Sequence, residues 1–160
     1  MIEVGEKLPE TTFAVMTDSG PAERRTSEVF GGRKVALFAV PGAFTPTCHN
    51  SHLPGFLANA DAFKAKGVDA VVCVSVNDAF VMGAWAKATG GEGTIEFLAD
   101  GSAEFAKATG LELDASARGL GIRSKRYAML VDDGVVKALL VEDVPGKAEI
   151  SSADALLAAI

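Results

Sequence analysis

The sequence is poor in cysteine, has no long hydrophobic run and has no excess of basic charge. Its two cysteines, Cys48 and Cys73, lie far apart in 160 residues, so nothing suggests a disulfide framework. The longest apolar runs, residues 35–40 and 70–76, are far shorter than the ~20 residues of a membrane-spanning helix. With 21 acidic and 15 basic residues the net charge is −6, which would repel nucleic-acid phosphates and anionic lipids. We expect neither nucleic acid nor a membrane surface as a partner.

The N-terminal residues and the composition describe an ordinary globular protein. The first ten residues, MIEVGEKLPE, carry acids where a secretory leader has a basic region followed by an apolar block. We therefore expect a cytoplasmic protein with both cysteines as free thiols. A chain of 160 residues that is 49% hydrophobic can bury a full core, so residues 1–160 are predicted to form one domain.

Hydrophobic patterning predicts an α/β fold. Residues 33–40 form a near-continuous apolar run that is typical of a central strand covered on both faces. Two apolar runs flank Asp133 and Gly134, which indicates a β-hairpin over residues 125–142. The other expected strands are residues 68–76 and 94–100, and the expected helices are residues 46–66 with a bend at Pro54, 77–90, 101–110 and 151–160. This order predicts a mixed sheet of parallel strands with an antiparallel hairpin at one side, flanked by helices.

Cys48 lies just beyond the strand that ends at Val40, at the sheet edge where α/β proteins bind ligands. Thr45 suits the N-cap of the following helix, Pro46 suits its first position, and Cys48 then takes the third. Unpaired N–H groups and the partial positive charge of the first helical turn favour a thiolate over a thiol. The position therefore predicts a reactive sulfur.

Ionisation alone adds little reactivity, because the nucleophilicity of a thiolate falls as its acidity rises. Fast chemistry needs fixed donors around the sulfur. Thr45 is one candidate, and a cationic donor is expected from residues 123–126. Arg126 is favoured because it adjoins an apolar strand, and Arg123 is the next candidate.

Pro41, Thr45 and Cys48 form the pattern Pro-x-x-x-Thr-x-x-Cys, which resembles the active-site motif of the peroxiredoxins. Three longer strings resemble the atypical branch of that family, also called the type II or fifth subfamily. They are PGAFTPTCHNSHLPGF, VSVNDAFVMGAW and KRYAMLVDDGVVKAL, and the similarity extends from VGEKLP to the end of the chain.

The resemblance implies a thioredoxin-like fold with an N-terminal extension. It implies that Cys48 attacks hydrogen peroxide or a small alkyl hydroperoxide and becomes a sulfenic acid. By the same resemblance Thr45 and Arg126 hold the peroxide, while Pro41 shields the pocket.

No bound cofactor is implied, and recycling would use an external thiol, either glutathione with glutaredoxin or thioredoxin. The branch forms homodimers, for which Phe44 and the turn before the helix of Trp85 are the expected contacts. Residues 74–160 contain no resolving cysteine and Cys73 is expected to be buried, so a one-cysteine cycle follows. Its sulfenic acid would be open to overoxidation.

Three other kinds of site could use Cys48. His52 lies one helical turn beyond it, but a hydrolase dyad needs a third group to orient its base, so packing of His52 within the helix is favoured. Zinc would lack ligands, and a dithiol motif would need a cysteine where Thr45 stands. The rival function is a redox-sensing module that passes the oxidised state of Cys48 to a partner protein. A sensor need not react much faster than an ordinary thiol.

Overall fold

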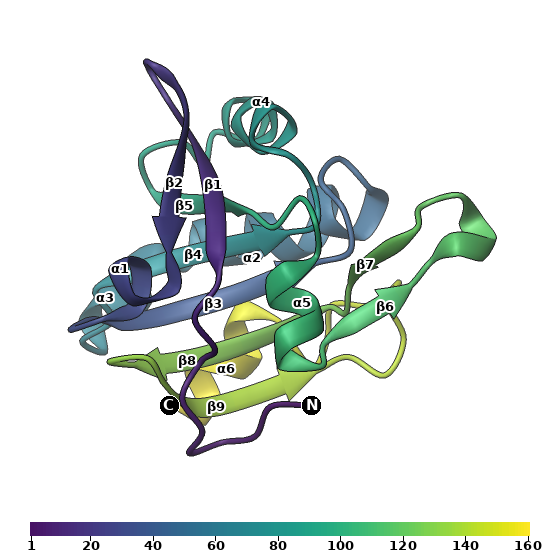
Figure 1. Ribbon diagram of the computed structural model, residues 1–160. Helices are drawn as coiled ribbons and strands as arrows, with labels where there is room; N and C mark the ends of the chain where they lie inside the picture. The colour runs from purple at the N-terminus through teal and green to yellow at the C-terminus, as the bar shows by residue number, and fades with distance from the viewer.

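The computed structural model describes all residues 1–160 and is built on a seven-stranded mixed sheet (Figure 1). The strand order is β2-β1-β5-β4-β3-β8-β9. Strands β3, β4 and β5 are parallel, while β8 pairs antiparallel with β3 and β9 with β8. The mixed sheet predicted from the sequence is confirmed. The strands are β1 (Thr12–Thr17), β2 (Gly20–Arg25), β3 (Lys34–Val40), β4 (Ala70–Ser75), β5 (Ile95–Ala99), β8 (Tyr127–Asp132) and β9 (Val135–Val141).

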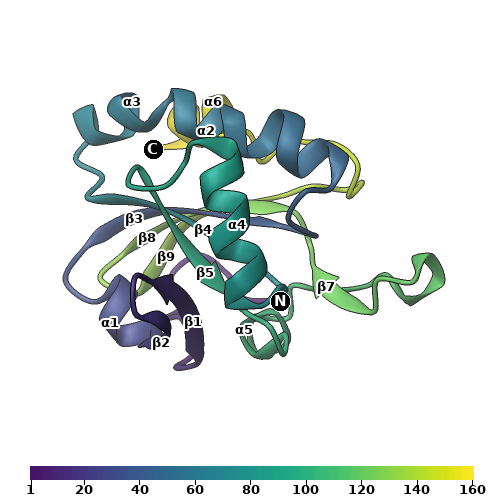
Figure 2. The ribbon, with the colours of Figure 1, turned by 90° about the horizontal axis from the view of Figure 1, so that it is seen from above.

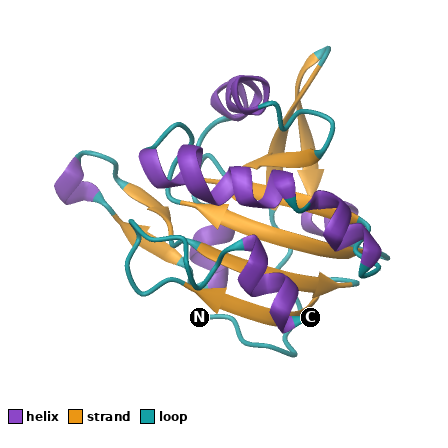
Figure 3. Ribbon diagram, turned by 180° about the vertical axis from the view of Figure 1, so that it is seen from behind, coloured by secondary structure: helices purple, strands orange, loops and turns teal.

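Helices cover both faces of this sheet. On one face lie α2 (Leu53–Ala58), α3 (Ala60–Ala65) and α6 (Ala153–Ala159), while α1 (Thr26–Phe30) and α5 (Glu104–Thr109) lie on the other (Figures 2 and 3). The longer α4 (Ala79–Thr89) packs into the core on the side of α2 through Met82 and Trp85. No helix is long and apolar enough to cross a membrane.

The apolar run of β3 supplies both halves of the core. Ala36, Phe38 and Val40 join the cluster under α2, and Val35 and Leu37 join the cluster on the opposite face. This alternation follows from the period of two of a strand. None of these side chains is exposed, because helices cover both faces, and β3 is therefore a rigid base for the loop that follows it.

The capping and turn residues noted in the sequence bound α4 and the hairpin of β8 and β9. The Asp78 carboxylate accepts a hydrogen bond from the N–H of Val81 at the start of α4, and Gly90 ends that helix in the left-handed conformation. Asp133 and Gly134 have φ values of 47° and 77°, which form the turn between β8 and β9. The predicted hairpin is confirmed.

The N-terminal segment is part of the sheet, whereas the sequence suggested only an extension. β1 and β2 form an antiparallel hairpin, and β1 joins β5 through the single pair Ala14 and Ala99. Hydrophobic patterning does not predict this hairpin, because β2 is mostly exposed and carries no apolar alternation.

Residues 111–124 are more ordered than the sequence indicated. β6 (Glu112–Asp114) and β7 (Ile122–Ser124) form a two-stranded arm, with a 3₁₀ turn at Ser116–Arg118 between them. The arm projects from the sheet and carries Arg123 on β7 (Figure 1).

The predicted helix over residues 46–66 is present in three pieces. A π-helical turn, η1 (Cys48–His52), precedes α2, and Asn59 separates α2 from α3. The N–H of Leu53 donates to the carbonyl of Cys48, five residues back. The irregularity expected at Pro54 thus lies just before it, because proline has no N–H and its ring would crowd an α-helical turn. Such π turns are frequent at functional sites.

Candidate active site

Cys48 is the first residue of the π turn and lies beside the C-terminal end of β3. The loop of residues 41–45, which we call the active-site loop, joins β3 to this helix. The Cys48 side chain has 0% exposure, so the sulfur is buried beneath the loop. The strand-end position agrees with the sequence, but complete burial was not predicted. A substrate must therefore be small.

Thr45 directs its hydroxyl at the sulfur. Its Oγ1 lies 2.9 Å from Sγ of Cys48 and 2.7 Å from the carbonyl oxygen of Gly42. A hydroxyl has one hydrogen, so it donates to one of these acceptors at a time. The expected side-chain cap is not formed, since no backbone N–H of the first turn donates to the Thr45 hydroxyl oxygen. The Thr45 carbonyl instead accepts from the N–H of His49 at 2.9 Å.

Arg126 lies just before β8 and brings a buried guanidinium to the same sulfur. Its Nη2 donates to Sγ of Cys48 at 3.0 Å, and its Nε donates to the carbonyl of Pro145 at 2.9 Å. Arg126 is only 3% exposed and forms no ion pair with a carboxylate. A buried cation needs a compensating partner, and the sulfur of Cys48 is placed to carry the negative charge. The two donors expected from the sequence are therefore brought together.

His52 holds the other end of the guanidinium. Nη1 of Arg126 donates to its Nδ1 at 3.1 Å, and its Nε2 donates to the carbonyl of Ser151 at 2.8 Å. Burial, together with the nearby positive charge of Arg126, lowers the His52 pKa to about 3, although the hydrogen bond to Ser151 acts in the opposite direction. His52 is thus neutral. Its ring also packs edge-on against Phe38 and Phe56, which confirms a packing role.

The network continues to Glu142, which sequence reasoning missed. Its carboxylate accepts hydrogen bonds from the N–H and the hydroxyl of Ser151, and its own N–H donates to the carbonyl of Arg126 at 3.0 Å. Cys48, Arg126, His52, Ser151 and Glu142 therefore form one connected set. No sequence motif predicts this set of contacts, because Ser151 and His52 are 99 positions apart.

Two further contacts hold the active-site loop. The N–H of Ala43 donates to the side-chain oxygen of Asn77 at 3.0 Å, and Nη1 of Arg123 donates to the carbonyl of Pro41 at 3.4 Å. Phe44 has φ of 65°, an uncommon conformation for a residue with a side chain. Such strained positions cluster at functional sites. Pro41 is half-buried at the start of this loop.

Cys73 is a free thiol on β4 with no exposed surface. Burial raises the pKa of this thiol well above its ordinary value, and a negative charge at Cys48 raises it further. A thiol that stays protonated is a poor nucleophile. The predicted burial of Cys73 is confirmed.

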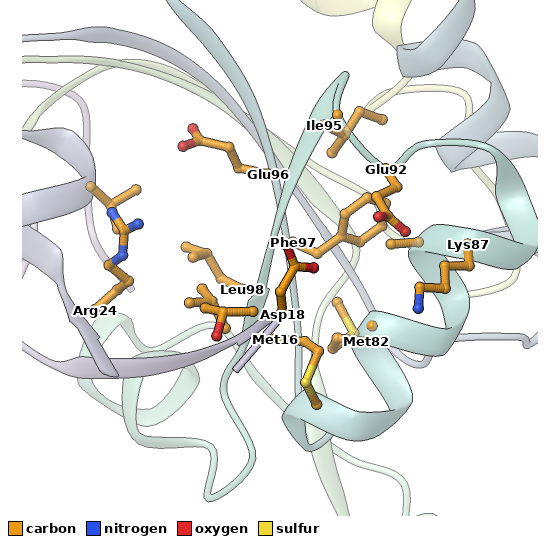
Figure 4. A pocket seen from close by; sticks show the side chains of 16 residues that line it. Met16, Asp18, Arg24, Met82, Lys87, Glu92, Ile95, Glu96, Phe97 and Leu98 are labelled. Carbon is orange, nitrogen blue, oxygen red and sulfur yellow. The ribbon is translucent and has the colours of Figure 1, made fainter. Parts of the chain in front are cut away.

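A cavity lies away from the cysteine. It has a volume of about 490 Å³ and is bounded by β1, α4 and β5, where the first strand diverges from the fifth (Figure 4). Met16, Met82 and Phe97 form part of its wall, and none of the residues described above at Cys48 lines it. This cavity therefore does not mark the site at Cys48, which is identified by the hydrogen bonds around its sulfur. No group of three or more possible metal-ligating side chains is present.

Known proteins similar to this chain match nearly its whole length. The Redoxin family model matches residues 3–157. Peroxiredoxin-2E-2, chloroplastic, from Oryza sativa subsp. japonica is 51% identical, over 99% of this chain and 72% of the relative. Peroxiredoxin-2B from Arabidopsis thaliana is 44% identical, over 99% of this chain and 98% of its own.

The chain belongs to the peroxiredoxin family. Peroxiredoxins are thiol-dependent peroxidases with an antioxidant role, and they need no prosthetic cofactor. The crystal structure of reduced Prx3 in complex with H₂O₂ from Vibrio vulnificus is 53% identical, covers 99% of both chains and has a TM-score of 0.94. The fold of this peroxiredoxin is thus thioredoxin-like, as the resemblance implied.

Proposed function

We propose that Cys48 is the peroxidatic cysteine of this peroxiredoxin and that Thr45 and Arg126 are its catalytic donors. The observation that carries the proposal is their convergence on one atom, since Oγ1 of Thr45 lies 2.9 Å and Nη2 of Arg126 lies 3.0 Å from Sγ of Cys48. The Arg126 guanidinium has no carboxylate partner, so it is placed to pair with the negative charge of the reaction at Cys48. Pro41 keeps bulk water from the sulfur as part of the active-site loop.

The reaction follows from these donors. The Cys48 thiolate attacks one peroxide oxygen, the O–O bond breaks, and the leaving alkoxide or hydroxide takes a proton to become alcohol or water. The sulfur becomes a sulfenic acid and the peroxide is reduced by two electrons. The Arg126 guanidinium and the Thr45 hydroxyl then stabilise the charge that develops on the peroxide oxygens, which is where fixed donors are most effective.

Hydrogen peroxide and small alkyl hydroperoxides are the proposed substrates. The sulfur is fully buried, so the peroxide must enter between Thr45 and Arg126 and take over the hydrogen bonds that they now give to Sγ. The Vibrio vulnificus relative was solved in complex with H₂O₂. Bulky hydroperoxides would meet the active-site loop first.

We also propose a one-cysteine cycle of the atypical branch. Cys73 is buried and protonated, so the sulfenic acid is reduced by an external thiol, either glutathione with glutaredoxin or thioredoxin. A steady-state assay that compares the two reducing systems separates them. If neither reducing system supported peroxide turnover, the proposed external-thiol cycle would be contradicted.

A homodimer formed near the active-site loop is supported by two exposed aromatic rings. Phe44 is 49% exposed and Phe80 is 67% exposed, at the loop and at the start of α4. Phe44 stacks on His49, whose Nδ1 accepts a hydrogen bond from Nε1 of Trp85. Analytical ultracentrifugation tests this directly, and a Phe80→Ser variant should weaken the dimer. A wild-type protein that sediments as a monomer would contradict it.

The decisive experiment compares Cys48→Ser with Cys73→Ser. Cys48→Ser should abolish thiol-dependent consumption of hydrogen peroxide while circular dichroism shows an intact fold. Cys73→Ser should keep most of the activity, since Cys73 lies outside the donor set. If Cys48→Ser remained active, the assignment of the peroxidatic sulfur would be wrong.

A further inference from the structure

Arg123 presents a second guanidinium at the edge of the active-site loop, and the reaction described above does not use it. Its Nε donates to the carbonyl of Leu120 at 2.9 Å, and its Nη1 donates to the carbonyl of Pro41 at 3.4 Å. These two bonds fix the plane of the group against the loop. The arm of β6 and β7 thereby contacts the loop that covers Cys48.

The guanidinium lies beside Thr45. A Cβ added at Gly42 would meet Nη1 of Arg123 at 3.0 Å and Cγ2 of Thr45 at 3.1 Å, so both atoms border the space above that glycine. Thr45 in turn contacts the sulfur of Cys48. A ligand held by Arg123 would therefore lie at the active-site loop, on the side of Thr45 that its methyl group faces.

One side of the Arg123 guanidinium remains free. Nη2 has no protein partner, and no buried polar side-chain atom in the structure lacks a hydrogen bond, so this nitrogen is not fully buried. Arg123 also forms no ion pair, since the two ion pairs of the structure join Arg25 to Glu10 and Arg33 to Glu96. A half-buried arginine with open donors and no carboxylate partner is suited to a carboxylate from outside.

We propose that Arg123 binds the carboxylate of a small anionic thiol that reduces the sulfenic acid of Cys48. This inference rests on the proposed function and names the chemical class of its reductant. The protein carries a net charge of −6, which repels anions as a whole. A local cation at the loop would offset that repulsion where the thiol must approach.

The chemistry balances with the thiol as the only reductant. Its sulfur attacks the sulfur of the Cys48 sulfenic acid, the S–O bond breaks, and the departing hydroxide leaves as water with the proton of the thiol. A mixed disulfide forms. A second thiol then displaces Cys48 as a free thiol, and the two thiols have become a disulfide.

The test compares two thiols of similar size, 3-mercaptopropionate with a carboxylate and 2-mercaptoethanol without one. Cys48 is first oxidised with one equivalent of hydrogen peroxide, and its reduction is followed by quenched-flow mass spectrometry. The readout is the ratio of the two rate constants, in which any general disturbance of the loop cancels. Arg123→Gln should lower this ratio about fivefold, the scale of a partly exposed charge-assisted pair.

Three controls sharpen the result. Arg118→Gln removes the same charge from an exposed site on the same arm and should leave the ratio unchanged. Arg123→Lys should give an intermediate ratio, because it keeps the charge and loses the planar fork. Added salt should lower the wild-type ratio.

An unchanged ratio in Arg123→Gln would overturn the proposal, and so would an equal fall in Arg118→Gln. Arg123 could instead bind the carboxylate of an anionic peroxide substrate. The rate of Cys48 oxidation by a hydroperoxide that carries a carboxylate, compared with the rate for hydrogen peroxide, tests this alternative. A larger Arg123→Gln effect on that step than on reduction would also overturn it. If the wild-type Cys48 did not react with hydrogen peroxide, the proposed function would fail at the first step, before any thiol is added.

Discussion

The guanidinium of Arg126 donates to Nδ1 of His52 at 3.1 Å, while the opposite ring nitrogen donates to the carbonyl of Ser151. A neutral imidazole has one donor and one acceptor, so these two contacts select a single tautomer. His52 therefore orients the arginine without competing for the sulfur. Four predictions follow from this arrangement and from the two cysteines.

Replacing Arg126 should slow the oxidation of Cys48. Arg126→Gln removes a charged donor from the sulfur, and the rate constant with hydrogen peroxide should fall by about 100-fold or more, the scale of one lost transition-state donor. Stopped-flow measurement under single-turnover conditions gives this rate. A loss smaller than threefold would show that Arg126 is not a catalytic donor, and the same measurement separates an enzyme from a slow redox sensor.

The part that the Thr45 hydroxyl plays in Cys48 oxidation can be tested with two substitutions, one that removes the hydroxyl and one that keeps it. Thr45→Val keeps the shape but removes the donor to Sγ, so oxidation should slow by about tenfold or more. Thr45→Ser keeps the hydroxyl and should retain most of the rate. If both variants reacted equally fast, the hydroxyl would have no part in the chemistry.

Stability should fall in acid because of His52. Its pKa is lowered from 6.5 to about 3 by burial, so folding holds it neutral. Between pH 6.5 and pH 3 the imidazole of His52 is protonated in the unfolded chain but neutral in the folded protein. The titration of His52 therefore leaves the stability of the folded protein unchanged above pH 6.5 and lowers it as the pH falls towards 3. Each pH unit in that window removes up to about 1.4 kcal/mol of the free energy of unfolding.

Urea unfolding of wild type and His52→Gln between pH 7 and pH 5 measures this slope. The variant cannot titrate at this position, so its stability should depend less on pH than that of the wild type. His49→Gln serves as the control, because it leaves His52 in place. Parallel curves for wild type and His52→Gln would contradict the assignment.

Excess peroxide without a thiol should overoxidise Cys48. The Cys73 thiol is buried and its pKa is raised, so it should not capture the sulfenic acid as a disulfide. Intact-mass analysis should show a gain of two oxygen atoms, and Cys73→Ala should give the same product. A loss of two hydrogens in the wild type, absent from Cys73→Ala, would replace the one-cysteine cycle with a two-cysteine cycle.

Much of the local structure near Cys48 could be predicted from neighbouring residues. The apolar run of residues 33–40 gave a buried strand, Asp78 and Gly90 bounded α4, and Asp133 with Gly134 gave the hairpin turn. Irregularity near Pro54 was also foreseen, although the π turn at Cys48–His52 was not. The hairpin of β1 and β2 was missed because an exposed edge strand carries little hydrophobic pattern.

By itself, the sequence determined that a cysteine follows a buried strand at the start of a helix, because capping, turn and strand signals act over a few residues. The motif fixed Thr45 three positions before Cys48, on the same side of the turn. Only the tertiary structure decided that Arg126, 78 positions away, donates to that sulfur, and that His52 and Ser151 hold the arginine in place. Contacts of this range depend on how the sheet and its helices pack, and no local pattern of residues encodes them.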